Sequence, residues 1–244
     1  MGVPTYVTVI QVATNLVVVL AIVVVLRSAR ERAGGGAGVP EAVGATLFAW
    51  LVATAALAAA GVYRPTTATA IPTLPIAVAI ALGGAWVAAT AIPSLRALID
   101  QPATQPSLVA LQLWRVIGVV FLVLLAQGQL PPLFALPAGL GDIAAGLAAP
   151  FVARRLRESE GRSSAIIWNA FGLLDLVVAI GLGATTNLGP IQIFHTNPSA
   201  AVMTAFPMAL VPTFLVPLSM VLHVLSLRYL LGARTASAGA VVTS

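Results

Sequence analysis

Cysteine and lysine are both absent from this chain of 244 residues. Without cysteine there is no disulfide, no thiolate metal site, no cysteine-ligated iron–sulfur cluster and no cysteine nucleophile. Without lysine there is no Schiff base to a carbonyl cofactor. Spaced histidine pairs, phosphate-binding loops and Gly-x-Ser-x-Gly elbows are missing as well. The favoured interpretation is therefore a protein that is not an enzyme and that holds no metal.

Charge is scarce too, since 8% of the residues are charged and 59% are hydrophobic. A soluble domain needs about a quarter of charged residues to cover its surface. Most of this surface must therefore face lipid, and the lipid bilayer is the first expected partner. The net charge of +5 comes from arginine alone. These arginines sit in short clusters between apolar runs, a pattern typical of membrane orientation and not of nucleic-acid binding.

Seven runs have the roughly 20 mostly apolar residues that a membrane-spanning helix needs. They cover 5–26, 43–63, 71–92, 108–127, 132–153, 164–184 and 203–228. We therefore predict an all-α integral membrane protein, a seven-transmembrane-helix bundle forming one domain over 1–231. The small, polar segment 232–244 is predicted to be a disordered cytoplasmic tail.

The arginines also predict the orientation, because cytoplasmic loops carry an excess of them. An amino terminus outside the cell and a carboxy terminus inside puts ten of the twelve in the cytoplasm: Arg27, Arg30, Arg32, Arg96, Arg154, Arg155, Arg157, Arg162, Arg228 and Arg234. Arg64 then lies outside, and Arg115 lies within a helix. The composition, rich in alanine, glycine and arginine, fits a GC-rich bacterial genome. We expect a multi-pass protein of the bacterial inner (cell) membrane that could form a homo-oligomer.

A weak internal repeat appears at an offset of 127 residues, where Pro4 matches Pro131 and Asn15 matches Asp142. The third and seventh runs share the pattern Ser-Leu-Arg-x-Leu, at 94–98 and 226–230. These matches suggest two parallel three-helix repeats joined by the fourth helix, a 3+1+3 plan of the kind found in transporters. Chance similarity between cytoplasmic helix ends is the alternative.

Four ionisable residues lie inside the apolar runs: Arg115, Asp142, Asp175 and His223. Each costs about 2.5–3.5 kcal/mol to insert and so needs an explanation. Each aspartate has a glycine three residues before it, Gly139 or Gly172, and a small residue four after it. Positions three and four apart share a helix face. We therefore expect both carboxylates where antiparallel helices approach closely, side by side and away from lipid.

The charges of these groups do not balance. Arg115 is always protonated and neutralises one carboxylate, so the other must take a proton, pair with protonated His223 or bind a cation. A proton-coupled transporter or ion pathway requires such a site. Alternatively, an Arg–Asp pair plus a protonated aspartate bonded to Asn15, Gln112 or Asn169 would only fix helix register. The candidate ion, proton or substrate site comprises Asp142, Asp175, Arg115, His223, Asn15 and Asn169.

The last apolar run contains three prolines, at 207, 212 and 217. Each removes a backbone donor and frees the carbonyl four residues earlier, on Met203, Met208 and Thr213. Such backbone is tolerated where it is buried in protein or lines a cavity. The run is predicted to form a bent gate, an ion-coordinating break or an ordinary kinked helix.

The layout resembles, in architecture alone, rhodopsin-type proteins and the small sugar transporters built from paired three-helix repeats. The first family implies a retinal-bearing lysine, which this chain lacks. The second implies Pro-Gln pairs in its hinge helices, whereas this chain has only Gln-Pro, in a loop. Neither family's functional residues can be carried over.

The leading hypothesis is a small-solute transporter or a proton or ion pathway acting on an unknown solute, with no cofactor. An alternative is a membrane redox or apolar-ligand protein that holds haem or quinone. A haem would have to use His223 alone, since His195 would lie about 40 Å away along a continuous helix. A third possibility is a non-catalytic subunit of a membrane complex.

Overall fold

The computed structural model describes residues 3–34, 38–158 and 160–242, with side chains described as far as Gly232. Every regular element in these ranges is a helix. Seven helical stretches are long and apolar enough to cross a membrane: Thr5–Arg32, Val39–Ala59, Thr73–Ala91, Pro102–Ala126, Pro132–Arg157, Arg162–Thr185 and Val211–Gly232. The predicted all-helical, seven-span architecture is confirmed, and it indicates a multi-pass membrane protein.

The first three spans are single helices followed by a short one at the end of the third: α1 (Thr5–Arg32), α2 (Val39–Ala59), α3 (Thr73–Ala91) and α4 (Pro93–Ile99). The fourth span is made of four pieces: η1 (Pro102–Thr104), α5 (Gln105–Leu111), η2 (Gln112–Gly118) and α6 (Val119–Ala126). The remaining elements form the last three spans and the loop before the seventh: α7 (Pro132–Arg157), α8 (Arg162–Thr185), η3 (Ala200–Thr204), η4 (Val211–Leu215) and α9 (Val216–Val242). The tail from 232 lies almost entirely outside the described side chains, so its disorder stays a prediction.

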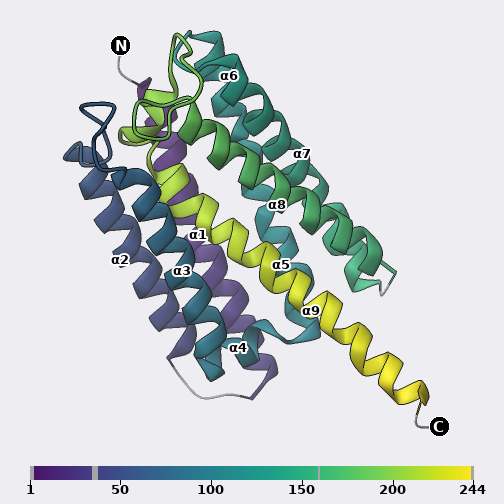
Figure 1. Ribbon diagram of the computed structural model, residues 1–244. Coiled ribbons are helices and arrows are strands. Elements are labelled where there is room, and N and C mark those ends of the chain that lie inside the picture. The colour runs from purple at the N-terminus through teal and green to yellow at the C-terminus, as the bar shows by residue number, and fades with distance from the viewer. Residues whose placement is uncertain (1–2, 35–37, 159, 243–244) are drawn as a thin grey trace.

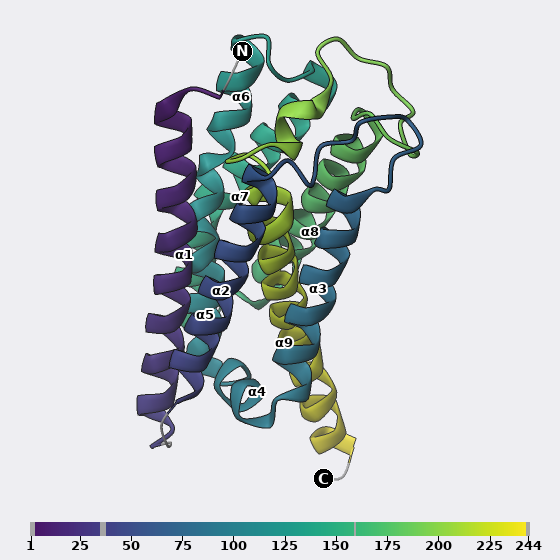
Figure 2. The same ribbon diagram turned by 90° about the vertical axis from the view of Figure 1, so that its left-hand side faces the viewer.

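α9 runs through the middle of the bundle, with α1, α2 and α3 on one side of it and α7 and α8 on the other (Figures 1 and 2). It contacts α3, α5 and α8. The seventh span is the most buried, at 56% of its window, and the third is the least, at 11%. Of the α3 residues, all of them described, Ala89 alone is buried. The centre of the molecule therefore lies along α9, and α3 stands at its edge.

The start of the seventh span differs from the sequence prediction. The span begins at Val211 and not at residue 203, because the chain forms the 3-10 helix η3 and a turn before it. Pro212 lies in η4, a single π-helical turn. The Thr213 carbonyl, which Pro217 frees, accepts a hydrogen bond from the Trp50 indole at 3.0 Å. The Thr54 hydroxyl donates to the Thr213 hydroxyl at 2.7 Å, so α2 holds this bend in place.

The end of the bundle that carries the C-terminus is tied together by polar contacts, and we call it the basic end. The Arg228 guanidinium on α9 donates to Asp100, just after α4, at 2.7 Å. The Arg32 guanidinium at the end of α1 donates to the Thr104 hydroxyl at 3.2 Å. Arginines also occupy the last turn of α7. Their clustering agrees with the sequence pattern, while the side of the membrane that this end faces, and the 3+1+3 repeat, stay predictions.

Two cavities flank α3. The first, of about 390 Å³, lies between α3 and the group α7, α8 and η4, and we call it the Asp142 cavity after the acidic residue in its lining. Its rim includes the α2–α3 connector and residues 187–191, so it lies toward the end that carries the N-terminus (Figure 2). The second, of about 470 Å³, lies between α2, α3 and α9, and its described lining is apolar except for Thr46 and Trp50. We call it the α2–α3 cavity.

Candidate functional site

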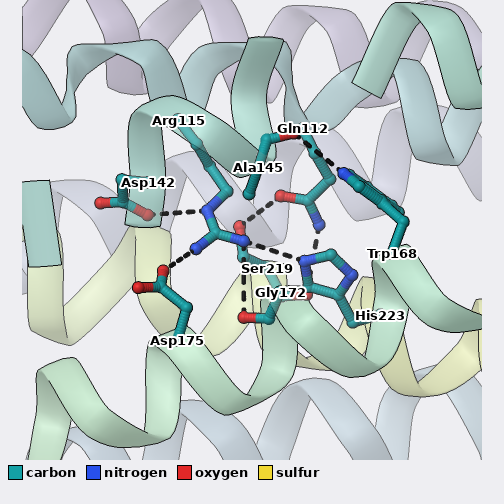
Figure 3. Close-up of polar contacts among 9 residues, drawn as sticks. All are labelled: Gln112, Arg115, Asp142, Ala145, Trp168, Gly172, Asp175, Ser219 and His223. Atoms are coloured by element: carbon teal, nitrogen blue, oxygen red, sulfur yellow. Dashed lines mark hydrogen bonds and ion pairs between the residues drawn. The ribbon is translucent and has the colours of Figure 1, made fainter. Parts of the chain in front are cut away.

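Arg115 lies at the centre of a polar cluster built from four elements (Figure 3). It belongs to η2 and is fully buried. Its Nε donates to Asp142 Oδ1 on α7 at 2.7 Å, and its Nη2 donates to Asp175 Oδ2 on α8. Its Nη1 lies 3.1 Å from His223 Nε2 on α9 and 3.5 Å from the Gly172 carbonyl. All three nitrogen atoms of this guanidinium therefore have a partner in the cluster.

The contacts of His223 define its protonation state. A guanidinium only donates hydrogen bonds, so His223 Nε2 must accept from Arg115 and carries no proton. The Nδ1 atom then bears the hydrogen and donates to Asn169 Oδ1 at 2.8 Å. The Asn169 amide nitrogen donates in turn to the Ala165 carbonyl and to the Ser226 hydroxyl, which agrees with its oxygen being the acceptor. His223 is thus neutral, and a histidinium is excluded as the second counter-charge.

One guanidinium therefore faces two carboxylates and a neutral imidazole. The side chains of Asp142 and Asp175 are each 8% exposed, and that of Arg115 is not exposed at all. With both carboxylates ionised, this dry compartment would carry one surplus negative charge, which is costly to bury. Either a proton on one carboxylate or a bound cation removes the surplus. Of the three options that the sequence left open, these two remain.

Glycines let the four elements approach this closely. A Cβ atom added to Gly172 would lie 2.5 Å from His223 Nε2 and 3.0 Å from Arg115 Nη1. One added to Gly141 would overlap the Asp175 carboxylate. Gly172 belongs to the predicted small-residue face of α8. On α7 the predicted face, with Gly139 and Gly146, lies against the fourth span, while Gly141, outside that face, meets Asp175.

A second polar pair and an aromatic ring surround the cluster. The Ser219 hydroxyl donates to Gln112 Oε1 at 2.8 Å, and the Trp168 indole donates to the Ala145 carbonyl at 3.0 Å. The Trp168 ring also lies against the His223 ring, with centroids 4.8 Å apart. The sequence contained a signal for the two serines of α9 that contact this region. Ser219 and Ser226 lie four before and three after His223 and so share its helix face.

The local geometry of η2 aims two polar side chains at α9. In a 3-10 helix residues three apart eclipse one another, and Gln112 and Arg115 are three apart. Gln112 reaches Ser219 and Arg115 reaches His223, both on α9. The sequence predicted a continuous helix here, so it missed the feature that sets these two side chains in register.

Access to the cluster differs between its two sides. The described residues that line the Asp142 cavity include Asp142 but not Asp175. Toward the basic end the cluster is backed by a buried apolar set: Val109, Ala149, Val152, Ala153, Ala165, Trp168 and Leu230. One carboxylate thus faces a cavity that opens toward the N-terminal end, while tight packing covers the other side.

Comparison with known proteins bears on this part of the chain. Residues 71–231 match a family described as Domain of unknown function (DUF8737). The chain belongs to the DUF8737 family. The family region runs from the start of α3 into α9, so it contains all four central residues of the cluster and leaves α1 and α2 outside. No curated protein and no solved structure matches the chain.

Two residues singled out in the sequence lie elsewhere. Asn15, on α1, is buried and donates to the Gln11 carbonyl at 2.7 Å. None of the hydrogen bonds between described residues joins it to the cluster, so its membership of the site stays a prediction. His195 is exposed, in the loop between α8 and η3. The structure brings together the other five candidates, Arg115, Asp142, Asp175, His223 and Asn169.

Proposed function

We propose that this protein is a transporter or proton pathway of a bacterial inner membrane, in which Asp142 and Asp175 share one exchangeable proton or cation. Arg115 is the fixed counter-charge. His223 and Asn169 hold the guanidinium in place through neutral hydrogen bonds.

The observation that carries the proposal is the contact of two buried carboxylates with one buried guanidinium, beside a neutral imidazole. Such a group of charges can exist in two states, one with a proton or cation bound and one without. Ionisable groups within a membrane-spanning bundle are typical of proton relays and substrate pathways. A cluster with all charges paired would have no such choice.

One-sided access supports a carrier more than an open channel. Asp142 faces a cavity toward the N-terminal end, whereas the basic end is tied by Arg228–Asp100 and Arg32–Thr104. In alternating access a central site opens to one side of the membrane at a time. A central site that is open toward the N-terminal end and closed toward the basic end is what one of those two states requires.

The competing interpretation is that the cluster only fixes the register of four helices. The two interpretations differ in whether proton occupancy changes. A structural cluster keeps one fixed protonation state over the working pH range, whereas a transport site gains and loses its proton. Infrared difference spectroscopy as a function of pH detects the C=O stretch of a protonated carboxyl group and so separates the two.

The test uses protein in liposomes with an internal pH dye and a membrane potential set by K⁺ and valinomycin. We expect proton flux in the native protein and its loss in Asp142→Asn and in Asp175→Asn. Glu158→Gln also removes one carboxylate, from an exposed pair with Arg154 that lies outside the cluster and outside the two ties of the basic end, and should keep the flux. Undiminished flux in both cluster variants, with no pH-dependent carboxyl band, would refute the proposal.

The haem alternative is less well supported by the contacts. Both ring nitrogens of His223 are engaged, by Arg115 and Asn169, and the residue is 1% exposed. Axial ligation would break one of these hydrogen bonds and open the packing around the ring. A visible absorption spectrum of the purified protein checks this directly, since a Soret band would reinstate the haem hypothesis.

A further inference from the structure

The Asp142 cavity joins an apolar wall to a single charged group. Its volume is about 390 Å³, within the range of pockets that hold small organic ligands. Among the described residues that line it, Asp142 alone carries a charge. The wall also includes the rings of Phe121 and Phe134, which pack edge to face at 5.6 Å between centroids.

The carboxylate of Asp142 has capacity left on the cavity side. Its Oδ1 accepts from Arg115, while no hydrogen bond among the described residues goes to Oδ2. Figure 3 shows this second oxygen pointing away from the guanidinium. Arg115 is shared with Asp175, so its charge is not available to Asp142 alone. Asp142, a residue of the cavity lining, therefore has an oxygen that can still accept a hydrogen bond or a positive charge.

We propose that the Asp142 cavity binds an organic monocation with an apolar body, its ammonium group at the Asp142 carboxylate and its body between α3 and α8. This rests on the proposed function and names the substrate class of the same site. The binding of one positive charge removes the surplus as a proton would, so cation and proton exclude each other. The transport that follows is exchange of an organic cation for a proton.

The lining selects against other ligand classes. Anions meet the surplus negative charge and no free cation in the cavity. Inorganic cations such as Na⁺ or Mg²⁺ need several oxygen ligands, whereas the wall of this cavity is almost wholly apolar. An ammonium group with methyl substituents needs fewer, because aromatic faces stabilise it through cation–π contacts. The described lining includes two phenylalanine rings, those of Phe121 and Phe134.

Among the described residues, the charged or titratable groups that line this cavity or share the cluster with Asp142 are five. They are Arg115 on η2, Asp142 on α7, Asp175 on α8, His223 on α9 and Tyr63 in the α2–α3 connector. Arg115 stays charged, and His223 is held neutral by its contact with Arg115. The proton released on cation binding therefore comes from the Asp142–Asp175 pair. In weakly buffered solution, binding should release up to one proton for each cation bound.

Benzyltrimethylammonium and neopentylbenzene are suitable probes, because they share one shape and differ in charge. Binding is measured by calorimetry on the full chain in phosphatidylglycerol nanodiscs, a lipid without a cationic headgroup. We expect the cation to bind at least tenfold more tightly than its neutral isostere, a difference of about 1.4 kcal/mol. Asp142→Asn should abolish this preference. Ala179→Phe, which adds bulk to the apolar wall, should weaken the binding of both probes.

The outcomes separate this inference from the proposed function. Equal binding of the two probes, or a preference that survives Asp142→Asn, would overturn the cation site while leaving proton flux as the test of the function. Cation binding without proton release or flux would support the site and contradict the exchange. Displacement of the probe by added phosphatidylethanolamine would overturn the inference too, because the cavity would then be a site for a lipid ammonium headgroup.

Discussion

Three charged side chains set the electrostatics of the whole protein centre. Arg115 touches Asp142 and Asp175 at once, so either single Asp→Asn substitution still leaves one carboxylate for the guanidinium. We expect each single variant to change the free energy of unfolding by about 1 kcal/mol or less. The double variant leaves a buried, unpaired guanidinium and should lose about 3–5 kcal/mol.

Denaturant titration of the four proteins in detergent measures this strongly non-additive pattern. Additive losses from the two single variants would mean that each carboxylate is held by its own partner. That result would remove the surplus charge from the description of the cluster.

Gly172 is the residue whose size the cluster tolerates least. An alanine there would push a methyl group against the ring of His223 and toward Arg115, so Gly172→Ala should cost about 1–3 kcal/mol of stability. Gly181 lies on the same helix with nothing within 4 Å of its added Cβ. Gly181→Ala is the matched control and should be neutral or stabilise by up to about 1 kcal/mol. Thermal unfolding of both variants in one detergent makes the comparison, and equal effects would contradict it.

The composition of the cluster followed from the sequence because so few ionisable residues lie in the apolar runs. No other charged residue or histidine lies inside the apolar runs away from their ends, so ion pairs there could form only among four residues: Arg115, Asp142, Asp175 and His223. The tautomer of His223 did not follow, because it depends on which ring atom meets the guanidinium. Asn15 was selected because it matches Asp142 in the internal repeat and could bond a protonated aspartate. Its amide nitrogen donates within α1, while its buried Oδ1 has no partner among the described residues, so the side chain is left outside the cluster.

At the scale of elements, the bend at the start of the seventh span depends on one indole. Trp50→Phe removes the indole N–H that donates to the Thr213 carbonyl. Pro217 has no backbone N–H to take its place. The buried carbonyl is then unpaired, which should lower the free energy of unfolding by about 1–3 kcal/mol. Pro217→Ala supplies a backbone N–H to the same carbonyl and should recover part of this loss in the Trp50→Phe background. Trp86→Phe on α3 is the control and should have little effect, since that ring is 37% exposed.

A double-mutant cycle measures the coupling between the two positions. Zero coupling between Trp50 and Pro217 would show that the indole contact does not hold the bend.

Hydropathy predicted the seven spans because burial in lipid dominates the choice of residue over some twenty positions. It predicted a continuous fourth helix over 108–127, whereas the chain there changes to the 3-10 form at η2. The change depends on the close approach of η2 to α7, where a Cβ on Gly146 would lie 2.7 Å from the Val116 nitrogen. Such contacts between distant segments leave no periodic signal. The cavities escaped prediction for the same reason.

At the scale of the molecule, the two ends of the bundle differ in charge. The arginine excess predicts that the basic end is cytoplasmic. The native chain has no cysteine, so single introduced cysteines report without background. In spheroplasts an impermeant maleimide should label Thr67→Cys, in the exposed α2–α3 connector, and should label Glu158→Cys, after α7, only once the membrane is opened. The reverse labelling would invert the orientation.

α3 forms part of the wall of both cavities, with residues 73–82 on the Asp142 side and residues 80–89 on the other. α3 thus separates the two cavities. It is held only weakly by its neighbours, since Ala89 alone among its residues is buried. Any sideways movement of this helix enlarges one cavity and shrinks the other. The volumes of the two cavities are therefore coupled, and a molecule bound in one cavity changes the volume of the other.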